Sequence, residues 1–194
     1  MREYPMIAWS DLSDCVFARW SPKIGDASVM GWVTVAAYGG AALLCAVAFS
    51  RAPDRAVRVF GWALAVLLAA LMVNKQLDLQ SAFTATGRCI SQIQGWYEHR
   101  QQFQFRFILG LLAVCAILGA GAFWLMRQHL RQVWLALLGL LLVISFVAVR
   151  AVGFHHFDEV INFRVKDVRM NWVLELSGLV LISINAIWLL FRRD

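Results

Sequence analysis

Charged residues are scarce in this chain. Only 15% of its 194 residues are Asp, Glu, Lys or Arg, whereas 61% are hydrophobic. A soluble domain is normally about a quarter charged and about half apolar, so this composition excludes an ordinary water-soluble domain. The mean hydropathy of +0.66 and the 9 tryptophans favour a protein whose surface faces lipid.

Features typical of several other protein classes are also missing. The chain has 3 prolines, no low-complexity segment and no convincing internal repeat, which predicts a single membrane domain over residues 1–194. Residues 1–26 lack the apolar core of a secretory signal, so we expect them to remain as an outer N-terminal tail. No C-x-x-C pair occurs, which argues against a dithiol oxidoreductase that passes electrons to quinone.

Five apolar stretches are long enough to cross a membrane, because roughly twenty residues at about 1.5 Å each span the hydrocarbon core. They cover about residues 27–49, 57–73, 106–126, 133–149 and 171–191. The sequence therefore predicts an all-α, polytopic membrane bundle of about five transmembrane helices. The outer connections, about 74–105 and 151–170, are long, and together with the tail they are expected to form an outer-facing polar cap.

Basic residues concentrate in short segments that a five-span bundle places on one side of the membrane. Seven of the 18 lie there, against only two acidic residues, Asp54 and Asp194: Arg51, Arg55, Arg58, Arg127, Arg131, Arg192 and Arg193. By the positive-inside rule we expect the N-terminus outside and the C-terminus in the cytoplasm. The basic residues end apolar runs and form no basic face, so membrane lipid, and not nucleic acid, is the expected partner.

Ionisable residues collect at the expected outer ends of three spans. Glu175 lies one turn inside the fifth span, where a carboxylate facing lipid would be costly, so it must face protein, water or a partner. The second span runs into NKQLDLQ, where Asp78 is a candidate ligand or base and can pair with Lys75 at i,i+3. We take Asp78, His155 and Glu175 as candidate catalytic residues. The alternative is a network of ion pairs satisfied by water.

The fourth span continues into RAVGFHHFDEVINF, which supplies His155, His156 and Asp158 as candidate ligands of a divalent metal. On a continuing helix His155 shares a face with Asp158, which suits a metal or an acid–base pair, although the segment does not match H-E-x-x-H. The alternative is interfacial hydrogen bonding and ion pairing. Candidates for binding a substrate or an anionic headgroup are Lys75, Arg88, Arg100 and Arg150.

The four cysteines divide by location. Cys45 and Cys115 fall inside spans and are expected to be packing residues. Cys15 and Cys89 fall in the expected outer segments, where an oxidising compartment would permit a disulfide. Only geometry can decide whether they pair.

Two polar residues are expected to serve folding. Asp26 precedes the first span and is placed to cap its first turn. Asn185 lies deep in the fifth span, where an interhelical hydrogen bond is expected.

Three blocks resemble a family of small bacterial inner-membrane proteins of uncharacterised activity. They are WSPKIGD, NKQLDLQ with the following GRC and GWY, and RAVGFHHFDEVIN leading to MNWVLEL. The likeness spans nearly the whole chain and implies a bacterial inner-membrane location without an activity. Membrane hydrolases of the alkaline ceramidase type offer only an analogy, because this chain has fewer spans and lacks their spaced His pair.

Two functions from different classes are compatible with these patterns. One is a non-catalytic accessory or assembly factor whose polar cap docks a membrane-protein partner or a second copy of the chain. The alternative is a metal-dependent hydrolase or transferase acting on an amphiphilic substrate at the outer leaflet. A small transporter, which would need oligomerisation, and a haem protein, with only His99 as an opposing ligand, are further alternatives. No motif specifies a reaction, so the sequence favours the first function.

Overall fold

The computed structural model describes residues 8–21, 27–77, 79–152, 164–165 and 168–192. Its helices are α1 (Trp9–Arg19), α2 (Val29–Ser50), α3 (Arg55–Leu77), α4 (Leu79–Ile93), α5 (Arg100–Met126), α6 (Leu130–Val152) and α8 (Met170–Phe191), with the short 3-10 helix η1 at Tyr97–His99. An antiparallel ladder joins β1 (Arg164–Val165) to β2 (Val168–Arg169) directly before α8.

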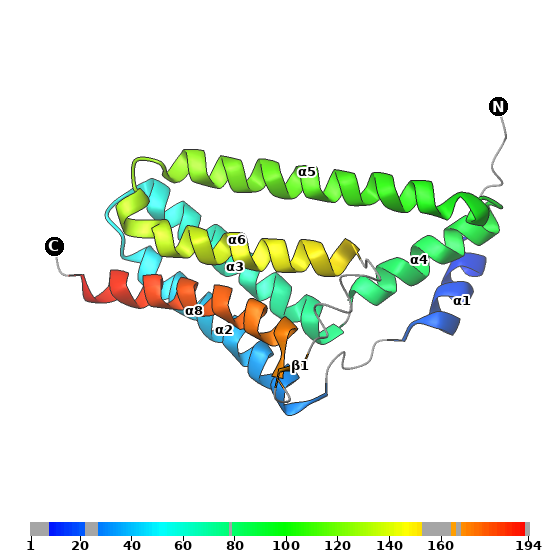
Figure 1. Cartoon of the computed structure of the whole chain (residues 1–194), viewed down its shortest axis with the longest axis horizontal. Coiled ribbons are helices and arrows are strands. Elements are labelled where there is room, and N and C mark those ends of the chain that lie inside the picture. The colour runs from blue at the N-terminus through cyan, green and yellow to red at the C-terminus, as the bar shows by residue number, and fades with distance from the viewer. Residues whose placement is uncertain (1–7, 22–26, 78, 153–163, 166–167, 193–194) are drawn as a thin grey trace.

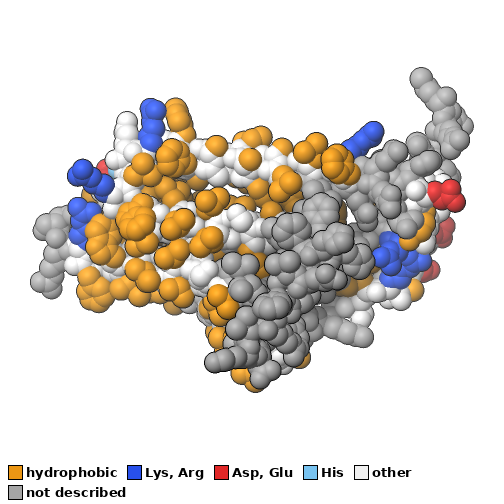
Figure 2. Space-filling model, viewed as in Figure 1, with side chains coloured by type: hydrophobic (Ala, Val, Ile, Leu, Met, Phe, Trp, Pro, Cys, Tyr) orange, Lys and Arg blue, Asp and Glu red, His pale blue; other side chains and the backbone are white. Residues whose placement is uncertain are grey.

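Four helices have the length and apolar composition of membrane spans. They are α2, α3, the Phe105–Met126 part of α5 and the Leu130–Ala148 part of α6. α8 contributes a shorter apolar segment, Glu175–Phe191. Hydrophobic side chains cover much of the visible surface of these helices (Figure 2). The expected all-α fold with several apolar helices of membrane-spanning length is confirmed, whereas the count of about five spans and the outer-facing polar cap stay predictions.

The long helices lie alongside one another, and the two ends of this bundle differ (Figure 1). At one end, which we call the Arg end, lie the α2–α3 connection (51–54), the α5–α6 turn (127–129) and Arg192 after α8. α1 and α4, which we call the cap helices, lie toward the opposite end. The short, arginine-rich connections therefore share one end, as the loop charges predict.

Small residues allow α6 and α8 to approach closely. A Cβ added to Gly139 would lie 2.5 Å from the carbonyl oxygen of Gly178, and one added to Gly178 would lie 2.9 Å from that of Gly139. Helices in lipid gain little from hydrophobic burial, so close backbone packing of this kind provides much of their association. α8 also packs against α2, which in turn packs against α3.

The side chain of Asn185 in α8 bonds to the backbone of α6. Its Oδ1 accepts a hydrogen bond from the N–H of Ala136 at 3.0 Å, and its Nδ2 donates to the carbonyl of Gln132 at 2.9 Å. Gln132 and Ala136 are i,i+4 neighbours, so the Asn185 amide bonds to the C=O and the N–H that pair with each other within α6. Asn185 is only 1% exposed, and its pairing avoids the cost of an unsatisfied buried amide. The expected interhelical hydrogen bond is confirmed.

The first span begins slightly later than expected and has a different cap. α2 starts at Val29, and the Oγ of Ser28 accepts a hydrogen bond from the N–H of Gly31 at 3.1 Å. Ser28 is therefore the N-cap, because its short side chain reaches a free first-turn donor. Asp26, the expected cap, lies outside the described residues.

Much of the expected outer tail and first outer connection is helical. α1 lies within the tail, with Asp11 in its first turn and Arg19 in its last, which complements the helix dipole. α4 occupies part of the expected 74–105 connection and continues beyond the second span. Helical spacing places Ala82, Cys89 and Ile93 along one side of it.

Gly95 terminates α4. Its φ of 71° is left-handed, a conformation that glycine adopts at little cost. The N–H of Trp96 donates to the carbonyl of Ser91, and the N–H of Gly95 donates to that of Gln92. This is the Schellman arrangement of a helix C-terminus. It ends the cap helix and lets the chain turn into η1 and α5.

We expect Gly178→Ala to destabilise the protein, because the new Cβ would overlap the carbonyl of Gly139 and the side chain of Val143. The loss in the free energy of unfolding should be about 1–3 kcal/mol, as for other overpacked sites. Thermal unfolding in detergent measures it. Gly121→Ala is the matched control, because no atom lies within 4 Å of its added Cβ. Equal destabilisation by both substitutions would contradict the close-packing interpretation.

Candidate functional site

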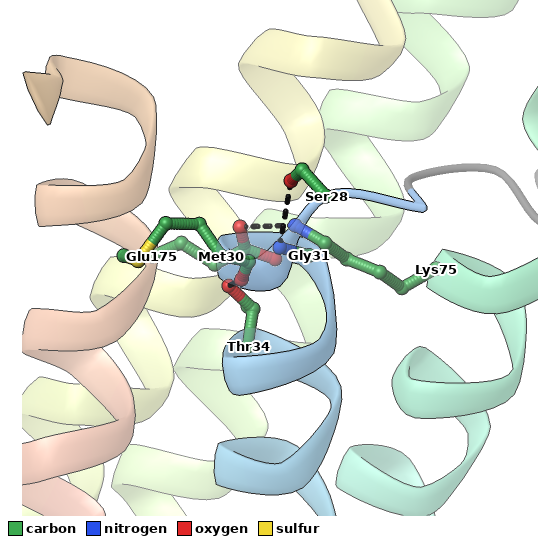
Figure 3. A network of polar contacts seen from close by, with 6 residues as sticks. All are labelled: Ser28, Met30, Gly31, Thr34, Lys75 and Glu175. Atoms are coloured by element: carbon green, nitrogen blue, oxygen red, sulfur yellow. Dashed lines mark hydrogen bonds and ion pairs between the residues drawn. The ribbon is translucent and has the colours of Figure 1, made fainter. Parts of the chain in front are cut away.

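A buried ion pair joins α3 to α8. The Nζ of Lys75, in the last turn of α3, lies 2.6 Å from the Oε2 of Glu175, in the second turn of α8. The side chains are 9% and 2% exposed, respectively. Figure 3 shows the two side chains extended toward each other at the level of the first turns of α2. The beginning of α2 and the end of α3 thus lie at the same level as the second turn of α8, which is distant from both in the sequence.

The short distance is that of a charge-assisted hydrogen bond, in which the ammonium donates to the carboxylate. Removing two charges from water is expensive, and the pair offsets this cost only while both partners are present. The sequence leaves Lys75, Arg150 and the two histidines open as partners of Glu175. Among the described side chains, Lys75 is the one that pairs with Glu175; Asp78, the expected i,i+3 partner of Lys75, lies outside the described residues.

The beginning of α2 supplies further polar groups at this level. The hydroxyl of Thr34, which is fully buried, donates to the carbonyl of Met30 at 2.8 Å. Ser28 caps the same helix end through Gly31 (Figure 3). Figure 3 draws the Lys75–Glu175 pair beside the Ser28–Gly31 and Thr34–Met30 hydrogen bonds of α2.

The other candidate residues are not brought together by the described part of the structure. Asp78, His155, His156 and Asp158 lie outside the described residues. Arg88 is exposed on α4, while Arg100 begins α5 and Arg150 lies near the end of α6, both with side chains outside the description. Among the described residues, no group of three or more His, Cys, Asp or Glu side chains is placed to hold a metal ion. The metal site stays a prediction.

A disulfide fastens the cap helices to each other. Cys15 of α1 pairs with Cys89 of α4, with their Cα atoms 6.0 Å apart. One turn further along, the guanidinium of Arg19 donates to the side-chain carbonyl of Gln92 at 2.7 Å. Geometry therefore decides the pairing that the sequence leaves open. The sequence predicts neither helix α1 nor the two contacts, the disulfide and the Arg19–Gln92 hydrogen bond, that join it to α4.

α1 exposes two large aromatic side chains. Trp9 is 84% exposed and Phe17 is 65% exposed. On α4, Phe83 is 61% exposed and also contacts Phe107 of α5, with ring centroids 5.1 Å apart. The aromatic groups of α1 are thus available to another molecule, and single exposed aromatics of this size are typical anchors of protein interfaces.

Comparison of the chain with protein-family models, with curated proteins and with solved structures finds no match.

We expect Lys75→Met to destabilise the protein strongly, because the Glu175 carboxylate would stay buried without its partner. Loss of one member of a buried pair costs about 3–5 kcal/mol, measured as the free energy of unfolding in mixed detergent micelles. The double substitution Lys75→Met with Glu175→Leu should recover most of this loss, since no charge remains buried. Arg106→Met, at an exposed position, is the control for removing a basic side chain. A double variant as unstable as the single one would contradict the pairing argument.

Proposed function

We propose that this chain is a bacterial inner-membrane accessory or assembly factor with five spans, whose cap helices dock an extracytoplasmic segment of another membrane protein. The observation that carries the proposal is α1: a short helix braced by the Cys15–Cys89 disulfide that presents Trp9 and Phe17 to its surroundings. A rigid element with exposed aromatic anchors costs little conformational entropy when it binds.

α8 is the proposed fifth span. It packs against both α6 and α2, and its Gly178 and Asn185 make the close contacts that hold it there. It also runs alongside the other long helices (Figure 1). An apolar helix of this kind enters the membrane together with the helices it packs on.

Two independent signals support an outer location for the cap helices. The basic residues of the Arg end predict that this end stays in the cytoplasm. The disulfide lies on the cap helices, and disulfides persist in oxidising compartments such as the bacterial periplasm. With an odd number of spans, both signals are satisfied when the N-terminus is outside and the C-terminus inside.

The ion pair supports a non-catalytic role over the metal-dependent hydrolase or transferase. That enzyme would use the carboxylate of Glu175 as a base or ligand. In the structure the carboxylate is bonded to Lys75 and nearly shielded from solvent. The pair instead joins α3 to α8, which is a structural role.

The chemistry of the partner follows from α1. Asp11 and Asp14 are exposed on the same helix as the aromatic anchors, and neither forms an ion pair with another described residue. Charge complementarity across an interface favours basic groups opposite acidic ones. We therefore expect a partner segment with apolar side chains flanked by Lys or Arg.

Photocrosslinking tests this surface. With benzoylphenylalanine in place of Phe17, irradiation of native membranes should give a discrete protein adduct of one mass. Asp11→Lys with Asp14→Lys should lower its yield severalfold, because the introduced lysines would repel the basic residues of the partner. The same probe at Leu118, an exposed residue of α5, should crosslink lipid only. An adduct that survives the charge reversal, or none at Phe17, would rule out this docking surface.

Thiol labelling tests the orientation independently. In a Cys45→Ser, Cys115→Ser background, a membrane-impermeant maleimide applied to spheroplasts should label Cys15 and Cys89 only after reduction, because they are paired outside. In a background without native cysteines, Gln128→Cys, at an exposed position of the Arg end, should react only after permeabilisation. The reverse pattern would show that the N-terminus faces the cytoplasm.

A further inference from the structure

The Arg end carries more positive charge than its described acidic groups can neutralise. The acidic side chain Asp54 lies 3.3 Å from Nδ1 of His129, a contact that joins the α2–α3 connection to the α5–α6 turn. Arg58 donates to the carbonyls of Ala52 and Pro53, each at 2.8 Å. Its donors therefore hold the loop that follows α2.

The remaining arginines on either side of the Asp54–His129 contact point to solvent. Arg51, Arg55 and Arg131 are exposed, and within the described part of the chain none forms a salt bridge. Asp54 and His129 bring the two connections into contact, and Arg51, Arg55 and Arg131 lie within three residues of this contact in the chain. Three guanidinium groups there can converge on one anion, and guanidinium matches the geometry of phosphate oxygens.

Aromatic rings mark the same end as a membrane interface. The guanidinium carbon of Arg127 lies 5.0 Å from the ring centroid of Trp124, and that of Arg192 lies 4.9 Å from the ring centroid of Trp188. Both tryptophans are exposed. Exposed Trp beside Arg is typical of the headgroup level of a bilayer.

α5 leaves apolar surface beside these charges. The 18-residue apolar window of α5 contains no buried residue, and among the described side chains of Phe105–Met126 only that of Met126 is fully buried in the core. A lipid whose headgroup lies at the Arg end can therefore extend its acyl chains along α5. A free phosphate ion would gain nothing from that surface.

We propose that the Arg end binds an anionic phospholipid of the cytoplasmic leaflet, with Arg51, Arg55 and Arg131 around the headgroup phosphate. The phosphate of the lipid also neutralises part of the excess positive charge that these arginines give to the two connections. The choice of leaflet rests on the proposed orientation, whereas the binding itself does not. Lipid binding is measured in detergent and does not depend on orientation. The thiol labelling described above tests the orientation, so it can refute the proposed orientation without bearing on the lipid site.

Native mass spectrometry and thermal unfolding of the purified full chain test the site. Added phosphatidylglycerol should remain bound in the spectrometer and raise the unfolding temperature more than phosphatidylcholine does. The triple variant Arg51→Gln, Arg55→Gln, Arg131→Gln should bind phosphatidylglycerol on the order of a hundredfold more weakly, since each charge near an anionic lipid surface contributes about fivefold. Inorganic phosphate should not compete at millimolar concentration.

Two controls keep the outcome interpretable. The charge-conserving triple replacement of the same residues by Lys should retain most of the binding, which excludes misfolding as the cause of the loss. Arg106→Gln removes an exposed arginine far from the Arg end and should leave binding unchanged. Any of three results would overturn the proposal. The two lipids could have equal effects, the Gln triple and Arg106→Gln variants could lose binding equally, or phosphate could displace the lipid.

Discussion

Lys75 and Glu175 are 100 residues apart in the chain, yet their charged atoms lie 2.6 Å apart. A carboxylate one turn inside an apolar helix needs a partner, because the hydrocarbon around it can supply none. The ammonium of Lys75 is this partner. It reaches the Glu175 carboxylate because the end of α3 and the beginning of α8 lie on either side of the beginning of α2 (Figure 3). The arrangement of these helices at the cap end thus depends on one ion pair, and Asn185 plays the corresponding part deeper in the bundle by bonding to the backbone of α6.

The two ends of the bundle meet different surroundings. At the Arg end, short connections expose arginines and tryptophans, a composition suited to lipid headgroups. Toward the other end, the disulfide and the Arg19–Gln92 hydrogen bond brace a pair of helices outside the long bundle. The Lys75–Glu175 pair is shielded from both surfaces. Its burial suits a structural contact, and the exposed ends are the regions through which the protein can meet other molecules.

Sequence reasoning succeeds where one physical requirement dominates. Runs of about twenty apolar residues predict long helices because backbone polar groups in lipid must bond within their own segment. Sequence reasoning fails at α1 and α4, which are amphipathic helices of 11 and 15 residues. It assigns the first to an irregular tail and the second to a loop. Their signals were present: Asp11 and Arg19 at the ends of α1, and apolar residues at helical spacing along α4. The polar composition of these segments concealed them.

The sequence by itself determined the membrane class, the apolar helices, the basic end and the need of Glu175 and Asn185 for partners, since all of these follow from hydrophobicity and from the cost of burying polar groups. Only the tertiary structure decided the partners. Lys75 reaches Glu175, Cys15 reaches Cys89, and Gly139 meets Gly178, because each contact depends on how helices distant in the sequence pack together. Several nearby residues satisfy the same local requirement, and packing selects among them.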